Sequence, residues 1–158
     1  MSMSKLLARA LLAFLLLPGA VAFLIPFFVI RPRASAFVHT VAWLPVGLGL
    51  ILLLWCVREF YVAGSGTLAP WSPPRSLVTT GPYRLSRNPM YIAVLLILFG
   101  WAAGFASLAL LVYAIAIAIA FHLRIVMYEE PVLATTQAAT WPLYKARVPR
   151  WFRLLRLM

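Results

Sequence analysis

The sequence predicts an all-α integral membrane protein with about four transmembrane helices, a helical hairpin and a cytoplasmic amphipathic C-terminal segment. Composition is the first indication: the 158 residues are 65% hydrophobic and 11% charged, whereas about a quarter of the residues in soluble domains are charged. The second is that basic residues flank long apolar runs instead of lining one face. The net charge of +11 therefore favours membrane lipids, and not nucleic acid, as the partner.

The first span is expected at about Leu6 to Ile30. Its basic start and apolar stretch are similar to a secretory signal. The apolar run continues, however, and the 21 uncharged residues from Ala10 to Ile30 are enough to cross a bilayer core of ~30 Å. We therefore expect an uncleaved transmembrane helix with kinks at Pro18 and Pro26.

The second span is expected at about Phe37 to Val57, after the polar connection RPRAS. It ends at the charged pair Arg58 and Glu59. The stretch that follows, YVAGSGTLAPWSPPRSLVTT, is rich in Gly, Pro and Ser, which predicts an irregular loop. Loops of this length in compact proteins are usually functional or disordered.

A helical hairpin is expected after the loop. No Asp, Glu, Lys or Arg occurs from Pro89 to Leu123, and a straight helix of that length would measure ~50 Å, which exceeds the ~30 Å bilayer core. Gly100 and Gly104 lie near the middle of the run. The expected arms are therefore residues 89–103 and 107–127.

The positions of Lys and Arg predict the topology. With four spans, both termini and the loop at 64–88 lie on one side, and Arg31 and Arg33 lie on the other. The end of the chain, Trp151 to Met158, has the pattern of an interfacial helix. We expect the termini and the functional site to be cytoplasmic, on the side that carries Lys5, Arg9, Arg75, Arg84, Arg87, Lys145, Arg147, Arg150, Arg153 and Arg156.

The motif GPYRLSRNPMY, residues 81–91, lies at the start of the apolar run. Pro89 suits the first turn of a helix, where its missing N–H costs nothing, and Asn88 can cap that helix. Arg84 and Arg87 add cationic donors beside the helix N-terminus, a natural site for an anion or a carboxylate. The alternative is a purely interfacial role, with the two tyrosines of the motif in an aromatic belt.

A pair of glutamates, Glu129 and Glu130, follows the last span directly. Ionisable groups near membrane depth are costly and indicate function. Because neighbouring helix positions point about 100° apart, we expect one to pair with an arginine and the other to bind a ligand ammonium or hydroxyl. His122 precedes Glu129 by about two turns and could share its face, although a packed or interfacial histidine is the alternative.

The segment WPLYKARVPRW is basic and aromatic, which is typical of a membrane anchor and also suits substrate binding. Its polar members are Tyr144, Lys145, Arg147 and Arg150. No metal site is expected, because the single Cys56 and the two distant histidines, His39 and His122, do not form a ligand cluster.

Three ordered blocks, GTLAPWSPPRSLVTTGPYRLSRNPMYIA, YEEPVL and YKARVPRW, resemble the membrane-bound isoprenylcysteine carboxyl methyltransferase family and its bacterial relatives. The related phospholipid N-methyltransferases share parts of this pattern. The resemblance runs from about Gly66 to Trp151. The length predicts a single membrane domain over 1–158, with two N-terminal spans at 1–63, and the resemblance implies a catalytic core with a cofactor pocket at 64–158.

The resemblance implies transfer of a methyl group from S-adenosylmethionine to a lipophilic or membrane-embedded acceptor, such as the carboxylate of a prenylcysteine-like substrate. Matching positions imply a cofactor pocket built from Tyr83, Arg84, Arg87, Asn88, Pro89, Tyr91, Glu129 and Glu130. The terminal block implies that Tyr144 and Arg147 lie near the acceptor or close the pocket. The catalytic candidates are Arg147, which could orient a carboxylate acceptor, and Glu130 or His122, which could take a proton from an amine acceptor.

The chain departs from the family pattern in two places. Asn88 stands where the carboxyl methyltransferases commonly have His, and Gln137, Ala138 and Trp141 stand where relatives often have Phe-Gly and a Tyr. Asn88 bears on the substrate class, so phospholipid or amine N-methylation is an alternative. Two further alternatives are an NADPH-dependent membrane reductase of the sterol reductase type and a non-catalytic membrane scaffold or lipid-binding protein.

Overall fold

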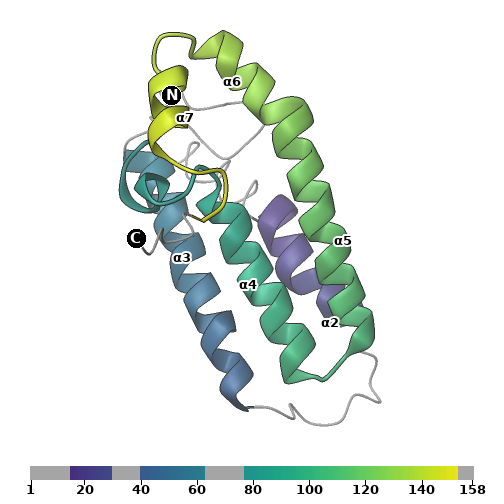
Figure 1. Ribbon diagram of the computed structural model, residues 1–158. Coiled ribbons are helices and arrows are strands. Elements are labelled where there is room, and N and C mark those ends of the chain that lie inside the picture. The colour runs from purple at the N-terminus through teal and green to yellow at the C-terminus, as the bar shows by residue number, and fades with distance from the viewer. Residues whose placement is uncertain (1–14, 30–39, 63–76, 153–158) are drawn as a thin grey trace, which may run out of the picture.

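The computed structural model describes residues 15–29, 40–62 and 77–152, and the regular structure in these ranges is all helical, as predicted. The main helices lie lengthwise side by side (Figure 1). They are η1 (Leu15–Leu24) with α2 (Ile25–Val29), α3 (Trp43–Val62), α4 (Pro89–Gly104) and α5 (Leu108–Arg124). The shorter elements are η2 (Thr40–Ala42), η3 (Gly81–Arg84), η4 (Ile125–Glu129), α6 (Glu130–Thr136) and α7 (Trp141–Arg147).

Several expectations fall outside the described residues. These are the start of the first span, the RPRAS connection, most of the long loop and the interfacial helix after Phe152. The described end of that loop is partly ordered, because η3 forms within it.

Two helical segments are long and apolar enough to cross a membrane, judged by length and composition: Thr40–Glu59 and Leu108–Thr136. The other two apolar helices, Gly19–Val29 and Pro89–Gly104, are shorter within the described residues. The 29 residues of Leu108–Thr136 would extend about 43 Å, longer than the ~30 Å bilayer core. The last turns of this segment therefore project beyond the core that its first turns can span.

The predicted hairpin is confirmed, with boundaries within a residue of those expected at its turn. α4 ends at Gly104 and α5 begins at Leu108. Ala106 turns the chain with a φ of 46°. Ser107 caps α5, where its hydroxyl accepts a hydrogen bond from the backbone N–H of Leu110 at 3.4 Å.

The helix that carries the two glutamates changes its winding just before them. Pro131 has no N–H, and a proline ring crowds the carbonyl four residues earlier in a helix. The chain accommodates it with the π-helical turn η4, in which the N–H of Glu130 bonds to the carbonyl of Ile125. Such π-turns occur frequently at functional sites, and this one sets the directions in which Glu129 and Glu130 point.

Prolines also shape the first helix, which is π-wound as η1 around Pro18 and continues as α2 through Pro26. Pro26 cannot donate to the carbonyl of Ala22, and the indole N–H of Trp101 binds that carbonyl at 3.1 Å instead. The hydroxyl of Tyr113 donates to the neighbouring carbonyl of Val21 at 3.1 Å. Lipid offers no hydrogen-bond partner for a backbone carbonyl, and here side chains of the hairpin provide one. These two bonds also attach the first helix to the hairpin.

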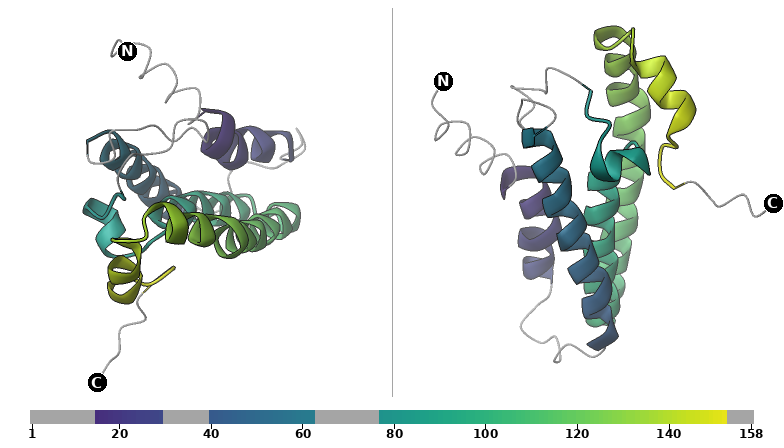
Figure 2. Two further views of the ribbon diagram at one scale, coloured as in Figure 1. Left: turned by 90° about the horizontal axis from the view of Figure 1, so that it is seen from above. Right: turned by 90° about the vertical axis from the view of Figure 1, so that its left-hand side faces the viewer.

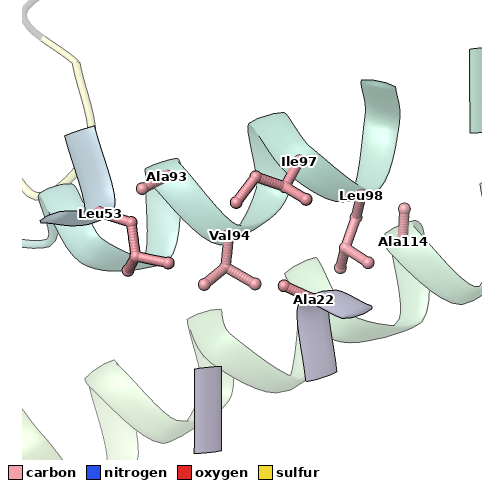
Figure 3. Close-up of a cluster of buried hydrophobic side chains, with 7 residues drawn as sticks. All are labelled: Ala22, Leu53, Ala93, Val94, Ile97, Leu98 and Ala114. Carbon is pink, nitrogen blue, oxygen red and sulfur yellow. The ribbon is translucent and has the colours of Figure 1, made fainter. Parts of the chain in front are cut away.

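The core of the bundle consists of small and aliphatic side chains that meet between the helices (Figure 3). Two glycines allow the close approach of α3 and α4. A Cβ on Gly49 would lie 2.7 Å from the carbonyl oxygen of Ala93, and one on Gly100 would lie 2.6 Å from Val46 Cγ2. The cluster in Figure 3 comprises Ala22, Leu53, Ala93, Val94, Ile97, Leu98 and Ala114.

The second span extends further than predicted. α3 continues to Val62, so that Arg58 and Glu59 lie inside the helix instead of ending it. The end of α3, the η3 turn, the start of α4 and the α6–α7 segment all gather at one end of the bundle (Figures 1 and 2). Most of the residues implicated by the sequence lie at this polar end.

Candidate functional site

A cluster of three charged residues lies at the centre of the polar end. Glu130 forms a bidentate pair with Arg150, whose Nε and Nη2 lie 2.8 and 2.9 Å from the two carboxylate oxygens. Arg87 Nη1 lies 3.0 Å from Glu130 Oε1. The cluster thus joins the GPYR block, the glutamate pair and the C-terminal block, and it holds two cations against one carboxylate.

Arg87 is the most enclosed member of this cluster, with a side chain only 9% exposed. Its guanidinium lies over the ring of Trp141, 5.3 Å from the ring centroid. Within the described residues, Arg87 Nε and Nη1 have no hydrogen-bond acceptor, because the contact with Glu130 is close but not aligned as a hydrogen bond. Burial lowers the pKa of Arg87 and the carboxylate of Glu130 opposes that shift. The site therefore presents a buried guanidinium with unused N–H donors.

The backbone segment before α4 is hydrogen-bonded to the C-terminal block. The N–H of Arg87 donates to the carbonyl of Pro149 at 2.9 Å, and the carbonyl of Arg150 accepts from Ser86 Oγ at 3.1 Å and from Asn88 Nδ2 at 3.0 Å. Asn88 does occupy the N-cap position of α4, with Pro89 buried in the first turn. However, its side chain makes no capping bond, so the expected cap is wrong: the amide is used as a donor to the C-terminal block.

Glu129 and Glu130 have different partners, as expected from their angular separation. Glu129 accepts a short hydrogen bond from the hydroxyl of Tyr91 and pairs with Arg124 Nε at 2.8 Å. The ring of Tyr91 also packs on Phe121, with centroids 4.3 Å apart. The arginine partner expected for one of the two glutamates is found for both.

Tyr83 and Tyr144 are brought together, although they are distant in sequence. Both are buried, and the hydroxyl of Tyr144 donates to the backbone carbonyl of Tyr83 at 2.8 Å. Burial raises the pKa of Tyr144 to about 12 and also raises that of Tyr83. Tyr144 therefore remains a protonated donor that fixes α7 against η3.

The remaining predicted residues lie at the edges of this site. Arg84 and Arg147 are exposed, and no side-chain ion pair involves either within the described part of the chain. His122 is also exposed and does not contact Glu129; instead Trp151 Nε1 donates to His122 Nδ1 at 3.4 Å, with the two rings stacked at 6.3 Å. The predicted shared face of His122 and Glu129 is not formed, because η4 alters the helical register between them.

A groove of about 590 Å³ runs between α4 and α5 and ends at His122 and Trp151. This volume falls within the range usual for small-molecule sites, ~300–1,000 Å³. Its remaining lining is apolar: Ile92, Leu95, Leu96, Phe99, Ile115, Ala118, Ile119, Leu123 and Phe152. Trp151 at the polar end of the groove is the sequence neighbour of Arg150, which belongs to the charged cluster.

Three participants in the site were not predicted as site residues: Ser86, Arg124 and Arg150. The sequence places Arg150 only in a basic and aromatic segment that suits membrane anchoring or substrate binding, because composition does not reveal that it pairs with Glu130. The pairing of Arg124 with Glu129 could have been predicted from the sequence, because Arg124 lies five residues before Glu129 on the same helix. Trp141, taken as a departure from the family pattern, is buried against Tyr144 and Val148 and retains an aromatic ring beside Arg87.

Comparison with known proteins identifies a family and a relative that the chain resembles. The family model described as "Phospholipid methyltransferase" matches residues 37–138. The chain is also 31% identical over 123 residues to the cobalt-zinc-cadmium resistance protein CzcN of Cupriavidus metallidurans. That match covers 78% of this chain and 52% of CzcN, so the chain spans about half the length of this relative. No solved structure matches the chain.

Proposed function

The chain belongs to the phospholipid methyltransferase family, and from this premise we propose that it is an integral membrane methyltransferase that uses S-adenosylmethionine and methylates a lipophilic acceptor. The family membership confirms the resemblance drawn from the three sequence blocks. The observation that carries the proposal is Arg87, a buried guanidinium with unused donors at the junction of those blocks.

The donor set at the polar end fits the chemical groups of this cofactor. Arg87 would bind its carboxylate, since guanidinium donors match a carboxylate in geometry and charge. Glu129, which already accepts from the hydroxyl of Tyr91, would accept from the ammonium or the ribose hydroxyls. When bound, the cofactor supplies a methyl group activated on a sulfonium, so the residues need chiefly to position the reactants and exclude water.

The groove between α4 and α5 would hold the apolar part of the acceptor. Its lining is aliphatic and aromatic, and its polar end lies at His122 and Trp151. A carboxylate acceptor needs no general base, and the exposed Arg147 would orient it. An amine acceptor needs a group to receive its proton, for which His122 or Glu130 would serve.

We also propose that the chain crosses the membrane four times and that its polar end faces the cytoplasm. The four apolar helices run in alternating directions in the bundle (Figure 1). The described basic residues of the polar end, including Arg87, Lys145 and Arg150, favour the cytoplasmic side. The cofactor would then enter from the cytoplasm, and the acceptor from the lipid.

Binding of S-adenosylmethionine to the purified protein in detergent, measured by calorimetry, tests the proposal. We expect Arg87→Met to weaken binding about tenfold or more, because a charge-assisted hydrogen bond to a carboxylate is lost. Arg87→Lys is the matched control: it keeps the positive charge but loses the paired N–H donors of the guanidinium, so binding should weaken less. A wild-type protein that does not bind S-adenosylmethionine but binds NADPH would overturn the proposal.

The acceptor class is tested by incubating membranes with methyl-labelled cofactor and separating a lipid extract from a protein fraction. The proposal expects label in a lipophilic product, and the stability of that label to mild base distinguishes an N-methyl group from a carboxyl methyl ester. Cofactor binding without any methyl transfer to either fraction would support a non-catalytic role instead.

A further inference from the structure

The third acidic residue of the chain, Glu59, lies outside the proposed cofactor pocket and is buried, with 7% of its surface exposed. Its carboxylate accepts hydrogen bonds from Trp55 Nε1 at 3.2 Å and from Arg58 Nη1 at 3.0 Å, both on its own helix. A third donor, the hydroxyl of Thr80 at 2.5 Å, lies 21 positions further along the chain. Thr80 is the residue directly before the GPYR turn, so Glu59 joins the end of α3 to that turn.

The backbone of the turn also depends on this contact. Gly81 has a φ of 55°, which favours glycine. A Cβ added there would lie 2.8 Å from the carboxyl carbon of Glu59 and 3.0 Å from Trp55 Nε1. The turn therefore approaches the carboxylate more closely than any side chain at this position would permit.

Two anchors thus hold the segment that carries Arg84 and Arg87. At its start, Thr80 is bound to Glu59. At its end, Ser86 and Asn88 are bound to the carbonyl of Arg150. The segment contains only one short helical element, η3, so these anchors limit its conformational freedom together with the burial of Tyr83 and its bond from Tyr144. A binding segment that is already ordered loses less entropy when its ligand binds.

We propose that Glu59 is a positioning residue, which holds the GPYR turn through Thr80 and thereby sets the location of Arg87 for cofactor binding. The part of this inference that concerns cofactor binding rests on the proposed function. The other part, that Glu59 orders the GPYR turn, is independent of any cofactor. Glu59 would not contact the reacting groups and would act only through the turn.

The test uses Thr80→Val, which replaces the hydroxyl with a methyl group, and Glu59→Gln, which removes the charge. Thr80→Ser is the matched control, because it keeps the hydroxyl. Amide hydrogen exchange is measured on the full chain in detergent without cofactor, and the Kd for S-adenosylmethionine is measured by calorimetry. We expect both disruptive variants to speed exchange over residues 79–86 and to raise the Kd about tenfold, with Thr80→Ser close to the wild type in both measurements.

Exchange in the middle of α4 and α5 should stay unchanged in these variants, which separates a local effect from general destabilisation. Unchanged exchange in the turn for both Thr80→Val and Glu59→Gln would overturn the inference, as would faster exchange spread evenly over the bundle. Faster exchange in the turn with an unchanged Kd would also overturn it, because the turn would then not position the binding group. A wild-type protein that does not bind the cofactor would instead refute the proposed function.

Discussion

At the scale of single residues, the two neighbouring glutamates have very different environments. Glu130 and its partner Arg87 have side chains 11% and 9% exposed, whereas Glu129 and Arg124 are 28% and 50% exposed. Removing one partner of a buried pair leaves the other charge without compensation, which costs more than the pair itself contributes. Exposed pairs contribute little because water and salt screen them.

Glu129→Gln and Glu130→Gln therefore form a matched pair of substitutions with unequal expected effects. Glu130→Gln leaves the guanidiniums of Arg87 and Arg150 without a counter-charge and should lower the free energy of unfolding by about 3 kcal/mol. Glu129→Gln should cost about 1 kcal/mol, since it disturbs an exposed pair and one hydrogen bond. Unfolding in mixed detergent micelles measures both, and equal losses would contradict the burial argument.

At the scale of elements, the sequence was most informative where one pattern determines the outcome. An uncharged run longer than a bilayer, with glycines at its middle, was sufficient to predict the hairpin of α4 and α5. The end of α3 was missed because Arg58 and Glu59 read as a terminus. Glu59 is buried within the helix, and its carboxylate accepts a hydrogen bond from Thr80, which lies in another part of the chain.

Residues of the candidate site were predicted unevenly for the same reason. The blocks predicted Arg87, Tyr91 and both glutamates, which the structure places in contact at the polar end, since each lies in a recognisable local motif. The pairing of Arg150 with Glu130 depends on how α7 folds back, and no local pattern reports it. The side-chain cap expected from Asn88 was wrong, because the amide instead binds the carbonyl of Arg150.

Packing of α3 against α4 provides a test at this scale. Gly49 faces α4, and a Cβ there would lie 2.7 Å from the carbonyl oxygen of Ala93 and 2.8 Å from Ile97 Cγ1. Gly49→Ala should therefore force the helices apart and lower the free energy of unfolding by about 1–3 kcal/mol. Gly47→Ala is the internal control: nothing lies within 4 Å of its added Cβ, so the better helix propensity of alanine should leave stability unchanged or raised. The same micelle unfolding assay measures both, and a Gly49→Ala protein as stable as Gly47→Ala would refute the close contact.

At the scale of the whole molecule, the bundle separates an apolar half from a polar end. The turn between α4 and α5 lies at one end, and η3, α6 and α7 gather at the other (Figures 1 and 2). The long segment Leu108–Thr136 connects the two ends. If its apolar part spans the bilayer, the hairpin turn and the charged cluster must lie on opposite sides of the membrane.

Cysteine labelling tests this arrangement in membranes. The native Cys56 is buried, and Cys56→Ala removes it as a background. Leu108→Cys, 74% exposed beside the hairpin turn, and Lys145→Cys, exposed on α7, then place one thiol at each end of the bundle. From the positive-inside rule we expect a membrane-impermeant maleimide to label position 108 in intact cells and position 145 only after the membrane is permeabilised. Labelling of both positions in intact cells would contradict a spanning α5, and the reverse pattern would retain the crossing but place the charged cluster, and with it cofactor entry, on the outer side.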